Sequence, residues 1–195
     1  MKVLGVVGSP RKGGNTDILV DKVLLGTQEN GNTTNKIFLN DLNIRPCQAC
    51  MSCKKTGRCA IDDDMQNIYT QILESECLVL GTPIYWLGPT AQMKTFIDRW
   101  YALLDANYKT KLKGKSAVII AVCGAPETSM TDFTVQAFEK MFGFIGIELK
   151  GKITISAREK AEVLDPSFNG ISKVYPLGLK NKSVLEEAFS LGTKL

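Results

Sequence analysis

Residues 2–16 read KVLGVVGSPRKGGNT, an apolar run followed at once by a glycine-rich turn. The run 2–7 has the length and the apolar character of a strand. Beyond the turn, apolar residues recur at helical spacing and predict a helix over about 16–28: Leu19, Val20, Val23 and Leu24. A strand, a tight turn and a helix in succession are typical of a β-α-β unit, so this stretch indicates a parallel sheet.

The same alternation of apolar runs and amphipathic stretches continues along the chain. Further strands are expected at about 34–39, 77–80, 116–122 and 147–155. Further helices are expected at about 65–73, 89–105, 131–142 and 183–191. We therefore predict an α/β fold with a flavodoxin-like, doubly wound, five-stranded parallel sheet of order 2-1-3-4-5, in three αβα layers.

Length and composition limit the architecture and the function. The chain has 195 residues, 44% hydrophobic and 23% charged, which predicts one domain over 1–195 with a cysteine-rich insertion at about 40–61 and a tail at 157–195. The net charge of +4 is scattered, so we expect no nucleic-acid partner.

We find neither a membrane-length apolar run nor a signal-peptide pattern, so we expect no membrane association and a cytoplasmic location. The chain contains no histidine, which excludes His-dependent triads and His-ligated zinc.

The turn after the first strand is a candidate phosphate site. In open α/β sheets, ligands bind beyond the carboxyl ends of the strands, and a helix N-terminus there attracts anions. The turn supplies side-chain donors and flexible backbone: Ser9, Arg11, Gly13, Asn15 and Thr16. Neither a Walker A lysine nor a G-x-G-x-x-G pattern is present. The alternative is a plain glycine-rich turn between strand and helix.

Two further loops are expected at the same edge of the sheet. The third strand ends in an apolar and aromatic stretch that would suit a planar ring: Pro83, Ile84, Tyr85 and Trp86. The fourth strand ends at Gly124, where a small residue would let such a ring lie flat. The alternative for Tyr85 and Trp86 is packing in the core or in a dimer contact.

Three motifs in this order resemble the NADPH-dependent FMN reductase family. They are the turn 8–16, the stretch TPIYW at 82–86 and the pattern K-x-F-x-D-R at 94–99, and the strand pattern extends the resemblance to about residue 155. The resemblance implies a flavin-dependent oxidoreductase with NAD(P)H as a candidate donor. It implies that Ser9, Arg11, Asn15 and Thr16 bind the FMN phosphate, and that residues 83–86 line the isoalloxazine ring. Asp98 and Arg99 are expected to brace their helix.

Four cysteines follow the spacing C-x2-C-x2-C-x5-C at Cys47, Cys50, Cys53 and Cys59. Zinc usually takes two separated pairs of ligands, whereas repeated C-x-x-C spacing suits the corners of an iron–sulfur cubane. Basic neighbours would favour thiolates: Lys54, Lys55 and Arg58. Cysteines without a loaded cluster, a disulfide or a zinc site are the alternatives. Cys77 and Cys123 lie in apolar strands and are expected to be buried.

The cysteine motif resembles that of iron–sulfur flavoproteins, a branch of the same family. This resemblance implies FMN paired with a [4Fe–4S] cluster, a homodimer or homotetramer, and ferredoxin or another small redox protein as partner. The motif differs from the cysteine motif of bacterial ferredoxins in two ways. No proline follows Cys59, and five residues instead of three separate the last two cysteines. These features are compatible with three functions: an electron-transfer iron–sulfur flavoprotein, a cluster-free NAD(P)H-dependent FMN or quinone reductase, and a non-redox module that binds a phosphate ligand.

Overall fold

The computed structural model describes residues 1–165, 167, 172–175 and 183–195, so parts of the predicted tail 157–195 lie outside the described residues. The strands are β1 (Lys2–Val7), β2 (Thr33–Phe38), β3 (Cys77–Tyr85), β4 (Gly88–Pro89), β5 (Ser116–Cys123), β6 (Glu148–Ser156) and β7 (Ser172–Tyr175). The α-helices are α1 (Asn15–Glu29), α2 (Ser52–Thr56), α3 (Met65–Glu74), α4 (Ala91–Asp98), α5 (Asp132–Ile145) and α6 (Val184–Gly192). Short 3-10 segments are η1 (Leu39–Asp41), η2 (Arg99–Leu103), η3 (Thr128–Thr131) and η4 (Glu162–Leu164).

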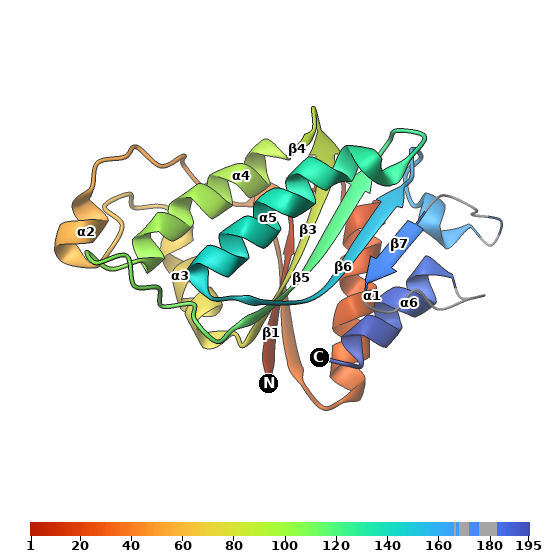
Figure 1. Ribbon diagram of the computed structural model, residues 1–195, viewed down its shortest axis with the longest axis horizontal. Coiled ribbons are helices and arrows are strands. Elements are labelled where there is room, and N and C mark those ends of the chain that lie inside the picture. Colours follow the sequence, from red (N-terminus) through yellow and green to blue (C-terminus); the bar gives the residue numbers. More distant parts are fainter. Residues whose placement is uncertain (166, 168–171, 176–182) are drawn as a thin grey trace.

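The strands form one sheet in the order β2-β1-β3-β5-β6-β7, with β4 paired to β3 (Figure 1). Its first five strands are parallel and confirm the predicted order and the flavodoxin-like fold. The prediction of five strands was incomplete, because β7 adds an antiparallel edge to β6 and β4 forms a hairpin with β3. Both additions are short, so neither leaves a long apolar run in the sequence.

Alternate residues of each central strand face opposite helical layers, as in β1. Leu4 and Val6 pack with residues of α3, α4 and α5. Val3 and Val7 pack with residues of α1 and α6 on the other face. Figure 1 shows these two helical layers on either side of the sheet. This three-layer packing fixes the carboxyl ends of β1, β3, β5 and β6 at one edge.

Two element boundaries differ from the prediction. Strand β3 continues past residue 80 to Tyr85, where it turns back into β4. The turn residues Trp86 and Leu87 have positive φ angles of 51° and 67°, a conformation that two-residue hairpin turns require. The helix expected over 89–105 ends at Asp98 and continues as η2.

In the part of the chain that the structure describes, we find no helix whose length and apolar character would let it cross a bilayer.

Candidate functional site

An open cleft of about 170 Å³ lies at the carboxyl edge of the sheet. Four loops that are far apart in the sequence line the cleft: Ser9, Arg11, Gly14, Asn15 and Thr16 after β1, Pro83–Tyr85 of β3, Val122–Gly124 of β5 and Ala157–Lys160 after β6. The structure therefore brings together most of the residues that the sequence marked as cofactor-binding.

The turn after β1 is held by its own backbone and by neighbouring side chains. The hydroxyl of Thr90 donates to the Gly8 carbonyl at 2.7 Å, and the Gly13 N–H donates to the buried carboxylate of Asp17, also at 2.7 Å. Gly13 has a left-handed φ of 65° and is not among the residues that line the cleft, whereas its neighbour Gly14 is. No side chain caps helix α1, whose N-cap is Gly14. The first N–H groups of α1 are therefore free of a side-chain cap at the cleft, where an anion is favoured.

Asn15 connects helix α1 to the loop after β6. Its side-chain N–H donates to the Glu159 carbonyl at 2.8 Å, and its side-chain oxygen accepts from the Val163 N–H at 3.2 Å. Both ends of the amide are thus engaged inside the protein. Asn15 lines the cleft, but its side chain bonds to the loop after β6, so its assignment to the phosphate stays a prediction.

The loop after β6 is the part of the cleft that the sequence analysis missed, because it treated 157–195 as a tail. Arg158 donates through Nε to the Gly124 carbonyl at 2.8 Å and so joins this loop to the end of β5. The Glu162 carboxylate accepts from the backbone N–H groups of Arg158 and Glu159 at 2.6 and 2.9 Å. The available signal was positional, since the loop after the fifth strand must also reach the carboxyl edge. Arg158 and Lys160 join Arg11 as cationic residues that line the cleft.

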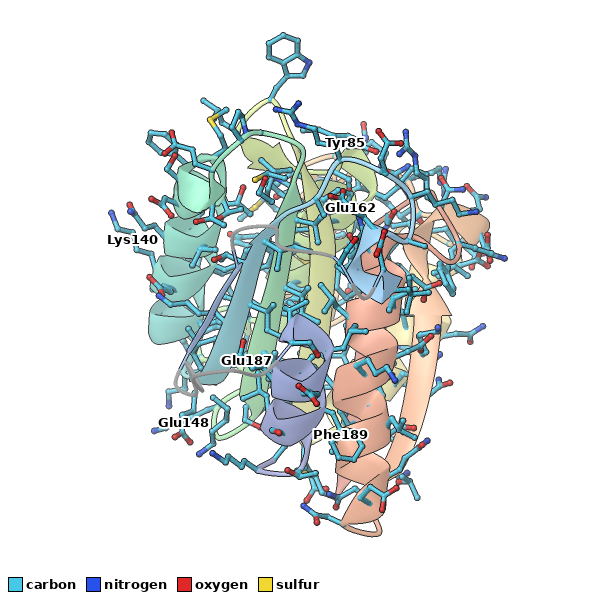
Figure 2. All side chains as sticks on the ribbon, turned by 90° about the vertical axis from the view of Figure 1, so that its right-hand side faces the viewer. Tyr85, Lys140, Glu148, Glu162, Glu187 and Phe189 are labelled. Carbon is cyan, nitrogen blue, oxygen red and sulfur yellow. The ribbon has the colours of Figure 1, made fainter. Side chains whose placement is uncertain are left out.

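The hairpin β3–β4 contributes only part of its predicted aromatic wall. Tyr85 is half-exposed and lines the cleft, and Figure 2 places it at the same end of the sheet as Glu162. Trp86 lies at the tip of the hairpin with its side chain fully exposed, and it is not among the residues that line the cleft. Its assignment to the ring site stays a prediction.

The four cysteines of the motif border a second, small hollow. Cys47 and Cys50 are exposed, while Cys53 and Cys59 are half-buried. Left-handed φ angles of 51° at Ala49 and 60° at Met51 turn the chain between cysteines. Non-glycine residues in this conformation are strained and concentrate at functional sites. All six cysteines are free, and Cys77 and Cys123 are buried as expected.

The predicted metal-ligand set is not gathered in this structure. Among the residues that the structure describes, no three side chains of ligand type lie close enough together to hold a metal ion. The ammonium of Lys54, expected to favour thiolates, instead donates to the carbonyls of Tyr101 and Leu104 at 2.7 Å each. Four thiols border one hollow, and thiolates are the usual ligands of iron–sulfur clusters.

Comparisons with known proteins identify the family of this chain. The sequence profile of the family described as NADPH-dependent FMN reductase matches residues 1–146. The chain is 38% identical over 130 residues to an iron-sulfur flavoprotein of Archaeoglobus fulgidus, which is 65% of this chain and 58% of that protein. It is 31% identical over 168 residues to YwqN of Bacillus subtilis, provisionally named an NAD(P)H-dependent FMN-containing oxidoreductase, which is 84% of this chain and 90% of YwqN.

The fold is also that of a solved structure. The Trp repressor binding protein of Bacillus subtilis is 27% identical and superposes with a TM-score of 0.66, covering 100% of this chain and 98% of that one. The family supports FMN as the ligand of the cleft, and it speaks against a non-redox phosphate module. The chain belongs to the NADPH-dependent FMN reductase family and is a flavin-dependent oxidoreductase.

Proposed function

We propose that this protein is an electron-transfer iron–sulfur flavoprotein, with FMN in the cleft and a [4Fe–4S] cluster held by Cys47, Cys50, Cys53 and Cys59. The observation that carries the proposal is that all four cysteines of the motif border one hollow. The name of the Archaeoglobus relative supports it. The chain spans 58% of that relative, so the proposal concerns the parts that the two proteins share.

The residues of the cleft fit FMN in two parts. Ser9, Arg11 and Thr16 lie with the uncapped start of α1, so this end favours the phosphate. Residues 83–85 and Gly124 also line the cleft and offer a wall for the ring. When bound, FMN supplies hydride and electron transfer, and the protein supplies its position and its surroundings.

The hollow fits a cluster in its donor set, since thiolates are the usual ligands of [4Fe–4S] clusters. A loaded cluster would add single-electron transfer to the two-electron chemistry of the flavin. The exposed positions of Cys47 and Cys50 leave this side of the hollow open to a protein partner. We propose ferredoxin or another small redox protein in that role, with NAD(P)H as the alternative donor, in a cytoplasmic homo-oligomer.

Anaerobic reconstitution with iron, sulfide and FMN tests the proposal. We expect about four irons and one FMN per chain, with absorption from both centres. Cys50→Ser should lose most of the iron and retain FMN. Cys77→Ala is the matched control, because Cys77 is buried in β3 away from the hollow, and it should retain both. Flavin without iron in the wild-type protein would overturn the cluster.

A cluster-free NAD(P)H-dependent FMN or quinone reductase is the second candidate. The observation in its favour is that the thiols are not gathered in this structure, and YwqN, matched over 90% of its length, carries a name of this kind. Steady-state NAD(P)H oxidation with a quinone acceptor separates the two candidates. Rapid turnover that is equal in the wild type and in Cys50→Ser would favour the cluster-free enzyme.

A further inference from the structure

Arg99 is a fully buried cation that reaches the cysteine segment. It begins η2, and its side chain has no exposed surface. Its Nη1 donates to the Arg45 carbonyl at 2.8 Å and to Asp63 Oδ2 at 2.6 Å. Its Nη2 donates to Asp63 Oδ1 at 3.1 Å and to the sulfur of Cys59 at 3.3 Å. The sequence pattern predicted only that Arg99 braces its helix, and this reach toward Cys59 goes beyond that role.

Cys59 is therefore held differently from the first two cysteines of the motif. Besides the sulfur contact, Gln66 donates through Nε2 to the Cys59 carbonyl at 3.2 Å and to the Ile61 carbonyl at 2.6 Å. Cys59 is half-buried, whereas Cys47 and Cys50 are exposed. One cysteine of the motif is thus held by residues of α3 and η2.

We propose that Arg99 is a positioning residue for the iron–sulfur site, which fixes Cys59 as its anchored ligand and donates an N–H···S hydrogen bond that sets the reduction potential of the cluster. This inference rests on the proposed function. It assigns to Arg99 a role in tuning the redox centre, in addition to its structural ion pair with Asp63.

The direction of the effect follows from charge. Reduction adds one electron to the cluster and makes its sulfurs more negative, so a donated hydrogen bond stabilises the reduced form more than the oxidised form. Hydrogen bonds to the sulfurs are an established determinant of cluster potential. The buried position strengthens the effect, because solvent screens little there. Arg99 should therefore raise the reduction potential.

Arg99→Lys is the test variant, because it keeps a cation for Asp63 and removes the forked donor. In the reconstituted holoprotein, we expect the equilibrium constant for cluster reduction to fall about tenfold. For one electron, this lowers the reduction potential of the cluster by about 59 mV. The FMN potential in the same titration should not change. Arg45→Lys is the matched control, because Arg45 is an exposed arginine of the same network whose side chain bonds the Asp62 carbonyl instead of a sulfur. Its cluster potential should equal that of the wild type.

Pulsed electron paramagnetic resonance gives a second readout that does not depend on the folding of Arg99→Lys. Wild-type protein with ¹⁵N only in its arginine guanidinium groups should show nitrogen coupling to the reduced cluster, and Arg45→Lys should retain it. A loaded cluster with no guanidinium coupling, or with an unchanged potential in Arg99→Lys, would overturn this inference and leave the proposed function standing. Wild-type protein that takes up FMN but no iron would overturn both.

Discussion

Asp63 and Arg99 form an ion pair whose side chains are both fully buried, with 2.6 Å between Nη1 and Oδ2. Burial by itself raises the pKa of Asp63, but hydrogen bonds from Arg99 and from the backbone N–H groups of Arg45 and Met65 outweigh it, so the pKa is lowered below 3.8. Because the folded pKa is below the unfolded one, the ionised carboxylate stabilises the fold above about pH 4. That contribution is lost as the pH falls through the folded pKa.

At the residue scale, Asp63→Asn should lower the free energy of unfolding by about 3–5 kcal/mol at pH 7, because it leaves the Arg99 cation buried without its counter-ion. Denaturant unfolding measures the loss. The difference between wild type and variant should shrink as the pH falls below 3.8, the ordinary pKa of the carboxyl group. The double variant Asp63→Asn/Arg99→Met should lose less than the single one. A difference that stays constant down to pH 2 would contradict this account.

At the scale of elements, helices α1 and α6 touch backbone to backbone. A Cβ on Gly26 would lie 2.1 Å from the Phe189 carbonyl oxygen, and a Cβ on Gly192 would lie 2.1 Å from the Val23 carbonyl oxygen. Figure 2 shows Phe189 on α6 beside α1. Glycine at these positions lets the backbones of α1 and α6 approach closely, although glycine has a lower helix propensity than alanine.

Gly26→Ala should therefore destabilise the protein, against the usual gain of about 0.5–1 kcal/mol for alanine in a helix. Gly143→Ala in α5 is the matched control, because nothing lies within 4 Å of its added Cβ. It should stabilise by roughly that amount. Thermal unfolding of both variants checks the prediction, which fails if the two substitutions shift Tm in the same direction.

The link between α1 and the loop after β6 gives a second prediction at this scale. Asn15→Ala removes two hydrogen bonds that hold a wall of the cleft. Because the loss of these bonds costs about 1–3 kcal/mol, FMN should bind about tenfold more weakly. Quenching of FMN fluorescence measures the affinity. Asn30→Ala is the control at the other end of α1, where the side chain donates to the Thr193 carbonyl at 2.6 Å. Equal FMN affinity in wild type and Asn15→Ala would refute the link.

At the scale of the whole molecule, the sequence predicted what depends on local pattern. The apolar runs predicted the five parallel strands. The turn after β1 predicted the position of the cleft, because the carboxyl ends of parallel strands meet at one edge of the sheet. Contacts between distant segments left no such pattern. The hydrogen bond from Arg158 to Gly124 spans 34 residues, and that from Arg99 to Cys59 spans 40. The exposure of Trp86 depends on a two-residue turn that the sequence analysis described as a loop.

Exposed apolar residues near the cleft predict self-association. Trp86 is 101% exposed and Phe133 67% exposed, and the Thr134 hydroxyl joins α5 to the hairpin at the Leu87 carbonyl. Such residues gathered on one surface are typical of protein interfaces. We expect a homo-oligomer by analytical ultracentrifugation, and Trp86→Glu should shift the sedimenting species toward monomer. Lys140→Glu on α5 is a control that should leave the mass unchanged. A monomeric wild-type protein would contradict the prediction.

The number of electrons that each chain accepts tests the central claim most directly. Anaerobic reductive titration of reconstituted protein, followed by absorbance, counts them. Our account predicts about three electrons per chain, two for FMN and one for the cluster, and about two in Cys50→Ser. About two electrons in a wild-type protein that carries a full complement of FMN would contradict it.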